Sequence, residues 1–323
     1  MSALRYRGPI TNHFDGKKFH NLEPPHKRGF IDFLRWQLTA KRGPWNKWTD
    51  TAVGAAPRLR VDGNGLRVTF INHATVLIQV EGLNILTDPI WSERASPVSW
   101  AGPKRHRPPG IRFEDLPPID LVLIGHNHYD HLDVKTLQRL NTDHRPRFIT
   151  GLGNRAFLNR QGITDVAELD WWESKTISDT ATVVCVPAKH FSGRGLTDGD
   201  STLWCGFVIQ ASSGNIYFAG DTGMGNHFDE IKRRFRNFRL VILPIGAYLP
   251  RWFMHPVHIS PTEAVEVHRI FAPTASIAIH FGTFALGDDG EFEPVVKLRE
   301  ALKNTDADSR FHVLEHGEGL NVP

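Results

Sequence analysis

The stretch from Gly125 to Asp133 constrains this chain most, because it places three histidines and an aspartate within six residues. The preceding run, 119–125, is apolar and rich in β-branched residues, which is typical of a buried strand. The following run, 134–140, has the apolar spacing of a helix, and Asp133 is suited to cap its N-terminus. The sequence therefore predicts a tight loop between a strand and a helix that carries His126, His128, Asp130 and His131.

The types of side chain on this loop indicate a metal site. Imidazole nitrogens and carboxylate oxygens are the usual donors to zinc and similar ions. In a bent loop, His126 and His128 can point to one position while Asp130 and His131 point to a neighbouring one. Two pairs of donors suggest two adjacent ions, which together can promote a displacement at phosphorus or carbon. A polar loop with solvated histidines is the alternative interpretation.

Three further candidate ligands each follow a strand-like run in the second half of the chain. His190 follows the run 181–189, Asp221 follows 215–220, and His280 follows 275–279. Rigid scaffolds present site residues where strand ends converge on one sheet edge, so we expect these residues to meet the histidine loop. A single histidine at a strand end is more often structural, and the prediction depends on all three positions together.

Composition and charge limit the classes of partner. The 323 residues are 40% hydrophobic and 23% charged, which is ordinary for a globular protein. Residues 1–60 contain twelve Lys or Arg against four Asp or Glu, which suits an anionic surface such as phospholipid headgroups. No nucleic-acid module is recognisable, so no nucleic acid is expected. Without an apolar run of membrane-spanning length or a signal sequence, we expect a cytoplasmic protein, with peripheral contact at the inner face of a membrane as an option.

The chain is predicted to divide near residue 60. Residues 1–60 would form a basic arm and a helix packed on the main domain, which would comprise 61–323. The helix, 30–38, has an apolar face, and two interpretations compete for it: packing on the main fold, which we favour, or lying on a membrane with neighbouring basic residues near headgroups. The face contains Phe30, Phe33, Leu34 and Leu38, and the basic residues are Arg35, Lys41 and Arg42. Residues 89–118 lack periodicity and are predicted to form a functional surface loop.

The candidate ligands also carry a resemblance. The histidine loop matches the His-x-His-x-Asp-His motif of the metallo-β-lactamase superfamily, and His190, Asp221 and His280 match its later ligands in order. This resemblance implies an α+β fold, namely a four-layer αββα sandwich with a dinuclear site at one sheet edge. Segments such as 168–173, 218–223 and 279–286 more specifically resemble the phospholipases D that hydrolyse N-acyl-phosphatidylethanolamine. That similarity extends from about the N-terminal helix to Leu302.

The resemblance implies a set of roles. One zinc would be held by His126, His128, His190 and Asp221, and the second by Asp130, His131 and His280, with Asp221 bridging. Two zinc ions per chain are thus expected, although other divalent ions suit the same donors. Asp130 and Asp221 would be catalytic by holding the ions that carry a hydroxide. His258 would lie near the substrate phosphate, although Val257 before it departs from the polar residue common in the family. His73 and Asp88 are candidates to support the ligands.

The function implied is cleavage of N-acyl-phosphatidylethanolamine, a phospholipid, to N-acylethanolamine and phosphatidic acid through attack at phosphorus. A lactonase, or another hydrolase of this fold with a non-lipid substrate, is the nearest alternative. A nuclease and a lipid- or partner-binding protein without activity are more distant ones. A homodimer is a further expectation from the resemblance alone.

Overall fold

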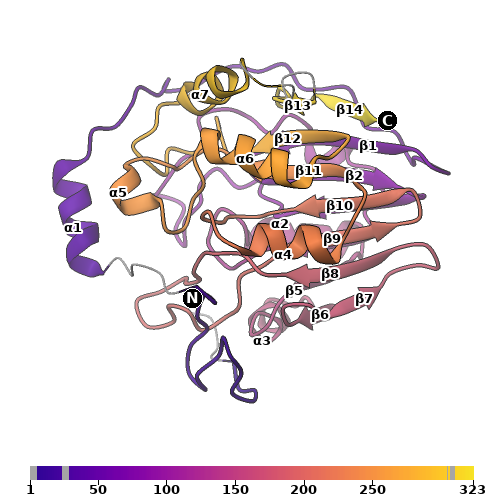
Figure 1. The fold of residues 1–323 in the computed structure, drawn as a ribbon, viewed down its shortest axis with the longest axis horizontal. Coiled ribbons are helices and arrows are strands. Elements are labelled where there is room, and N and C mark those ends of the chain that lie inside the picture. The colour runs from indigo at the N-terminus through magenta and orange to yellow at the C-terminus, as the bar shows by residue number, and fades with distance from the viewer. Residues whose placement is uncertain (1–5, 24–28, 304, 306–309) are drawn as a thin grey trace.

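The computed structural model describes residues 6–23, 29–303, 305 and 310–323. In these residues, two seven-stranded sheets stack face to face (Figure 1). The first sheet contains, in spatial order, β14 (Gly319–Val322), β1 (Leu66–Asn72), β2 (Thr75–Val80), β3 (Leu83–Thr87), β4 (Leu121–Ile124), β5 (Arg147–Gly151) and β6 (Val166–Leu169). The second contains β13 (Phe311–His312), β12 (Ala275–Ile279), β11 (Phe238–Pro244), β10 (Gly214–Phe218), β9 (Gly206–Ala211), β8 (Thr182–Val186) and β7 (Ser174–Thr176).

Both sheets have the same pattern of strand directions. In the first, the three pairings from β14 to β3 are antiparallel and the three from β3 to β6 are parallel. In the second, the three from β7 to β10 are antiparallel and the three from β10 to β13 are parallel. The two halves of the chain are therefore structurally similar, although the sequence shows no internal repeat.

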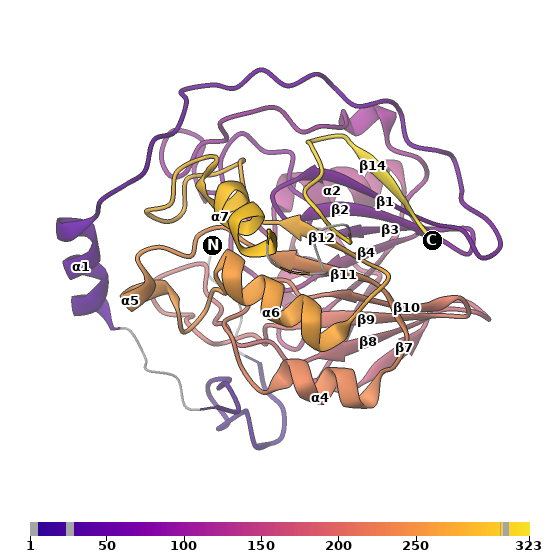
Figure 2. The same ribbon diagram turned by 45° about the horizontal axis from the view of Figure 1, so that its top comes forward.

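Helices cover the outer face of each sheet, which makes four layers (Figures 1 and 2). The first sheet is covered by α2 (Val134–Asp143) and α3 (Arg155–Arg160), whose apolar side chains share a core with β4 and β5. The second is covered by α4 (His227–Arg234), α6 (Pro261–Phe271) and α7 (Glu293–Leu302). The expected αββα sandwich is confirmed.

Strand β4 shows why the sequence before the histidine loop is continuously apolar. Leu121 and Leu123 belong to the core between the sheets, whereas Val122 and Ile124 belong to the core beneath α2. A strand buried on both faces has no polar alternation. The loop that follows β4 is therefore attached to a strand that is buried on both faces.

The N-terminal helix α1 (Phe30–Thr39) lies at the edge of the molecule beside α5 (Arg251–Met254), as Figure 1 shows. Trp36 makes the contact: its indole stacks on Phe253 with ring centroids 5.0 Å apart and donates a hydrogen bond to Asp288. Leu34 and Leu38 are exposed, as is Phe33, and the side chain of Phe30 lies outside the described residues. The helix therefore packs on the main domain through Trp36, on its opposite side. The prediction that the apolar face makes this contact is wrong for Phe33, Leu34 and Leu38.

Residues 89–118 form an irregular segment, with only the short helix η1 (Phe113–Asp115), as predicted. The prediction of a surface loop is wrong for part of it. Arg105 is buried, and its guanidinium donates to the carbonyls of Ile90 and Ser92. This segment joins the two halves of the molecule through a bridge between Arg105 and Phe284.

Candidate metal centre

The predicted site residues meet at one edge of the sandwich. The histidine loop follows β4, Asp221 follows β10, and His280 comes directly after β12. These strands belong to the parallel parts of the two sheets, whose carboxyl ends open onto the same edge. His190 reaches the same place from the segment after β8. All seven predicted ligands therefore lie together at this edge, where strand ends converge.

Three histidines form the first group of donors. Nε2 of His126 lies 2.7 Å from Nδ1 of His128, and Nε2 of His190 lies 3.3 Å from that same Nδ1. Nitrogens bound at about 2.0–2.1 Å to one tetrahedral zinc are roughly 3.4 Å apart. The three rings are therefore arranged as donors to a common ion would be.

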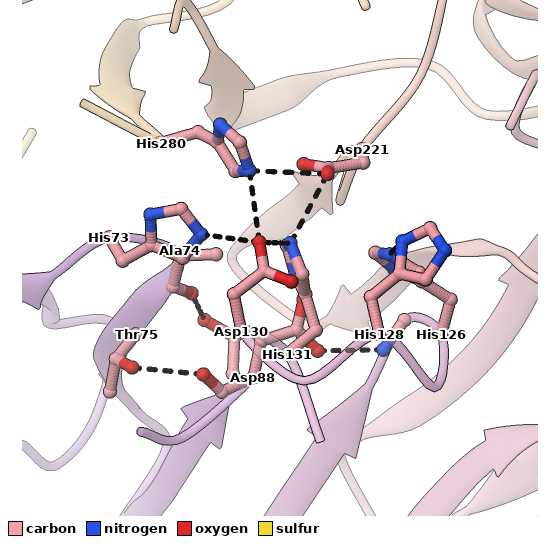
Figure 3. Close-up of polar contacts among 12 residues, drawn as sticks. His73, Ala74, Thr75, Asp88, His126, His128, Asp130, His131, Asp221 and His280 are labelled. Atoms are coloured by element: carbon pink, nitrogen blue, oxygen red, sulfur yellow. Dashed lines mark hydrogen bonds and ion pairs between the residues drawn. The ribbon is translucent and has the colours of Figure 1, made fainter. Parts of the chain in front are cut away.

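Two aspartates and two histidines form the second group, with Asp130 at its centre in Figure 3. Oδ2 of Asp130 lies 3.2 Å from Nε2 of His131 and 3.6 Å from Nε2 of His280. Oδ2 of Asp221 lies 3.2 Å from each of those nitrogens. The same oxygen is 3.8 Å from Nε2 of His190, in the first group. Asp221 thus stands between the two groups.

The donor atoms have the unmet bonding capacity that a divalent ion would satisfy. Oδ1 of Asp221 is buried without a hydrogen-bond partner, and the buried Nε2 atoms of His131 and His280 lie 3.2–3.6 Å from carboxylate oxygens without forming a hydrogen bond. Such orphaned polar atoms are unfavourable in a protein interior unless something else binds them. The combination of imidazoles and carboxylates suits zinc and neighbouring transition metals. The residues present fit a pair of divalent metal ions.

Burial sets the protonation of the first group. It lowers the pKa of His128 to about 3 and that of His190 to about 4, so both rings are neutral near pH 7. Neutral imidazole is the form that coordinates metal. For Asp221, burial acts to raise the pKa, but the charges of His131 and His280 outweigh it and hold the pKa well below its usual range. Asp221 is therefore a carboxylate, as a ligand must be.

His258 lies at the same pocket, in the segment between α5 and α6. Its Nδ1 is buried, has no hydrogen-bond partner and is 4.0 Å from Oδ2 of Asp221. Its ring centroid is 5.1 Å from that of His190. The position is compatible with the predicted contact to substrate, and also with a ligand role beside His190 and Asp221.

His73 and Asp88 contact two of the predicted ligands, as supporting residues would. Nε2 of His73 is 2.9 Å from Oδ2 of Asp130. Asp88 lies 2.6 Å from Nδ1 of His131 and accepts a 2.7 Å hydrogen bond from the amide of Gly125. A carboxylate on the far nitrogen of a ligand histidine fixes its tautomer and orientation. In Figure 3, His73 lies beside Asp130 and Asp88 lies below the donor groups.

Sequence reasoning missed the residues that hold the histidine loop itself. The amide of Gly193 donates to the side chain of Asn127, which stands between two of the histidines. Arg194 donates to the carbonyls of Asn127 and Leu132, and its guanidinium lies over the ring of Tyr129. No local sequence pattern predicts these contacts, because they join segments about 65 residues apart.

Comparisons with known proteins agree with this architecture. Residues 83–281 match the family model described as the beta-lactamase superfamily domain. The chain is 41% identical over 268 residues to N-acyl-phosphatidylethanolamine-hydrolyzing phospholipase D 1 of Caenorhabditis elegans, covering 79% of this chain and 75% of the relative. It is 37% identical over 301 residues to an uncharacterized protein of Mycobacterium tuberculosis, covering 90% and 80%.

Solved structures share the fold at low sequence identity. The isothiocyanate hydrolase from Delia radicum gut bacteria has a TM-score of 0.63 at 21% identity, covering 79% of this chain and 98% of that one. The metallo hydrolase Igni18 of Ignicoccus hospitalis has a TM-score of 0.60 at 20% identity, covering 80% and 99%. At these identities the likeness shows the fold alone. With the family model and the relatives above, the chain belongs to the metallo-β-lactamase superfamily, as a metal-dependent hydrolase that resembles the N-acyl-phosphatidylethanolamine-hydrolysing phospholipases D.

Proposed function

We propose that the protein is a zinc-dependent phosphodiesterase of the phospholipase D type, which hydrolyses N-acyl-phosphatidylethanolamine to N-acylethanolamine and phosphatidic acid. The observation that carries the proposal is the position of Asp221, whose Oδ2 lies within 3.8 Å of donors from both groups. Two adjoining groups that share one carboxylate suit a two-ion centre for in-line displacement. The phospholipid substrate is supported by the name of the relative that is 41% identical.

Each group of donors would hold one ion. His126, His128 and His190 would hold the first, and Asp130, His131 and His280 the second, with Asp221 shared. When bound, such ions supply Lewis acidity and lower the pKa of water toward neutrality. His73 and Asp88 would keep Asp130 and His131 oriented.

His258 would position the phosphate. Burial lowers its pKa well below the usual range, so the ring is neutral and carries one N–H. That N–H would donate to a non-bridging phosphate oxygen, where charge increases as the displacement proceeds. The unpartnered Nδ1 supports this role, since a buried ring atom facing a pocket is available to a ligand.

The exposed face of α1 supports contact with a lipid surface. Leu34 and Leu38 are exposed beside Arg35, Lys41 and Arg42, which combines apolar anchors with charges that attract anionic headgroups. Among the described residues, no helix is long and apolar enough to cross a membrane. We therefore propose peripheral binding, at the cytoplasmic leaflet, through residues 1–60, with 61–323 as the hydrolase domain.

The direct test uses His128→Ala and Asp221→Asn, each of which removes one proposed ligand. Both variants should bind less zinc and lose at least about 100-fold in kcat on N-acyl-phosphatidylethanolamine, as expected when a catalytic metal centre is disrupted. His255→Ala is the matched control, because its side chain is 57% exposed and outside both groups. Product masses identify the bond that is cleaved.

A lactone panel separates the alternative function. If the zinc-loaded protein opens lactones and cleaves no phosphodiester, the phospholipase proposal is wrong and a lactonase is supported. If neither substrate is turned over while zinc binds at both groups, the substrate class is wrong but the metal centre stands.

A further inference from the structure

The N-terminal arm reaches the metal centre through one side chain, Asn21. Its Nδ2 donates a 2.9 Å hydrogen bond to the carbonyl of His190, and the amide of His190 donates a 3.1 Å bond back to its Oδ1. These two bonds clamp the main chain of His190 from a residue 169 positions earlier in the sequence. The indole of Trp204 donates to the same Oδ1 at 3.0 Å, which fixes the orientation of the amide.

Glu23 extends this connection to the residues on either side. It accepts from Nζ of Lys189, at 3.2 Å, and from the amide of Asn226. The amide of Lys189 in turn donates to Oγ1 of Thr222, directly after Asp221. Segment 21–23 therefore contacts the chain next to two of the proposed ligands.

His190 needs such support because no strand or helix holds it. It lies in the irregular segment after β8. Its Nδ1 contacts the carbonyl of Val257 at 3.0 Å, which orients the ring. Within the described part of the chain, the hydrogen bonds found for its main-chain amide and carbonyl are those to Asn21. A displacement of about 1 Å here would separate its Nε2 from the other two histidines, and metal sites tolerate about half of that.

We propose that Asn21 is a positioning residue of the metal centre, which fixes His190 for the ion shared with His126 and His128. The basic arm is then part of the site rather than only a surface attachment. This inference rests on the proposed two-ion function. It applies to one group of donors. In the described residues, the hydrogen bonds of Asn21 are to His190 and Trp204, not to Asp130, His131 or His280.

The experiment compares Asn21→Ala with His13→Ala in the full chain. His13 anchors the same arm elsewhere: its Nε2 is 2.7 Å from Oδ1 of Asp170, and its ring stacks on Trp171. Zinc affinity is measured by competition with a chelator, and His190→Ala identifies the ion of the first group. Asn21→Ala should lower the affinity for that ion by about 10- to 100-fold, the usual effect of losing a supporting partner. His13→Ala should leave this affinity unchanged.

Thermal unfolding of the metal-free proteins separates positioning from general destabilisation. Both variants should lower the melting temperature by similar amounts relative to wild type. Asn21→Asp is a second variant, because it keeps the acceptor for His190 and Trp204 but sets an oxygen against the His190 carbonyl. Asn21→Asp should also lower the affinity for the ion of the first group. Unchanged zinc affinity in Asn21→Ala, or equal weakening in His13→Ala, overturns the inference. A wild-type protein that binds no zinc instead overturns the proposed function, and the positioning role with it.

Discussion

At the scale of single residues, three residues at the site have backbone conformations that most residues avoid. His73, Asp88 and His280 have φ values of 47°, 35° and 64°, in the left-handed region. Such conformations persist only where surrounding contacts enforce them, and they gather at functional sites. His73 and His280 are linked directly, because the amide of His280 donates to the carbonyl of His73. The two sheets are thus joined at the metal centre by strained residues.

Asp88→Asn tests the support of His131. In Asp88, one carboxylate oxygen faces Nδ1 of His131 and the other accepts from the amide of Gly125. An asparagine has a single acceptor oxygen and no charge, so it cannot replace both. Zinc affinity should fall by about 10- to 100-fold. Chelator competition measures this, with Asp143→Asn at the exposed end of α2 as the control. Wild-type affinity in Asp88→Asn would show that the carboxylate does not tune the ligand.

His258→Ala separates substrate contact from metal binding. If His258 touches the phosphate, the variant should retain its zinc and lose about 100-fold in kcat, the effect typical of removing one donor that stabilises developing charge. Metal analysis and steady-state kinetics on the same preparation give both quantities. A loss of zinc in His258→Ala would instead assign His258 as a ligand.

At the scale of elements, local hydrogen bonding explains how the site segments begin and end. Helix α6 starts with a capping box, in which Ser260 accepts from the amide of Glu263 and Glu263 accepts from the amide of Ser260. Glu263 also receives both bonds from Arg251 of α5, which holds the segment containing His258. Helix α4 begins immediately after the Asp221 loop, with His227 as its first residue.

His227 should make the stability of this region depend on pH. Burial lowers its pKa to about 3, although nearby Glu23 acts in the opposite direction. Because the unfolded ring titrates near 6.5, the unfolded state takes up protons first, and stability falls as pH decreases below about 6.5. The contribution should be about 2 kcal/mol between pH 7 and pH 5. Urea unfolding of the metal-free proteins measures this. From pH 7 to pH 5, the free energy of unfolding should decrease by about 2 kcal/mol less in His227→Gln than in wild type. An identical pH dependence in both would contradict the assignment.

The exposed face of α1 predicts a change in membrane binding without a change in stability. Leu34→Glu with Leu38→Glu alters residues that are already exposed, so the free energy of unfolding should stay within about 0.5 kcal/mol of wild type. Partitioning to anionic vesicles should fall at least about tenfold, because two apolar anchors are lost. Gln37→Glu, on the same helix, is the control for added charge. Equal vesicle binding by all three proteins would exclude α1 as the contact.

At the scale of the whole molecule, the metal centre lies where two similar halves meet. Each sheet has its own helical cover, and the donors come from loops of both halves. The fold therefore does not require metal for its core, whereas the site concentrates buried carboxylates and histidines that an ion would stabilise. Metal should add stability through binding to the folded state only.

Removal of metal should lower the melting temperature without loss of secondary structure. Zinc at 100 times its dissociation constant stabilises the folded state by about 2.7 kcal/mol for each site. Thermal unfolding with and without chelator, followed by circular dichroism, measures the difference. A melting temperature that is independent of chelator would contradict metal binding at this site.

Local patterns in the sequence determined the strands and the donors. The strand-like runs 119–125, 215–220 and 275–279 became β4, β10 and β12 within two residues of their predicted bounds, because burial and periodicity are properties of a few neighbouring residues. The sequence 126–131 likewise specified donor types and a strand-to-helix loop. Its helix was also predicted, and α2 ends three residues later than expected.

Only the tertiary structure decided which parts of the chain meet. It placed Trp36 rather than Leu34 and Leu38 against the main fold, because the indole found both a ring to stack on and the carboxylate of Asp288. It also brought Asn21 to His190. Contacts over such separations depend on the free energy of packing the whole molecule, which no short stretch of residues encodes.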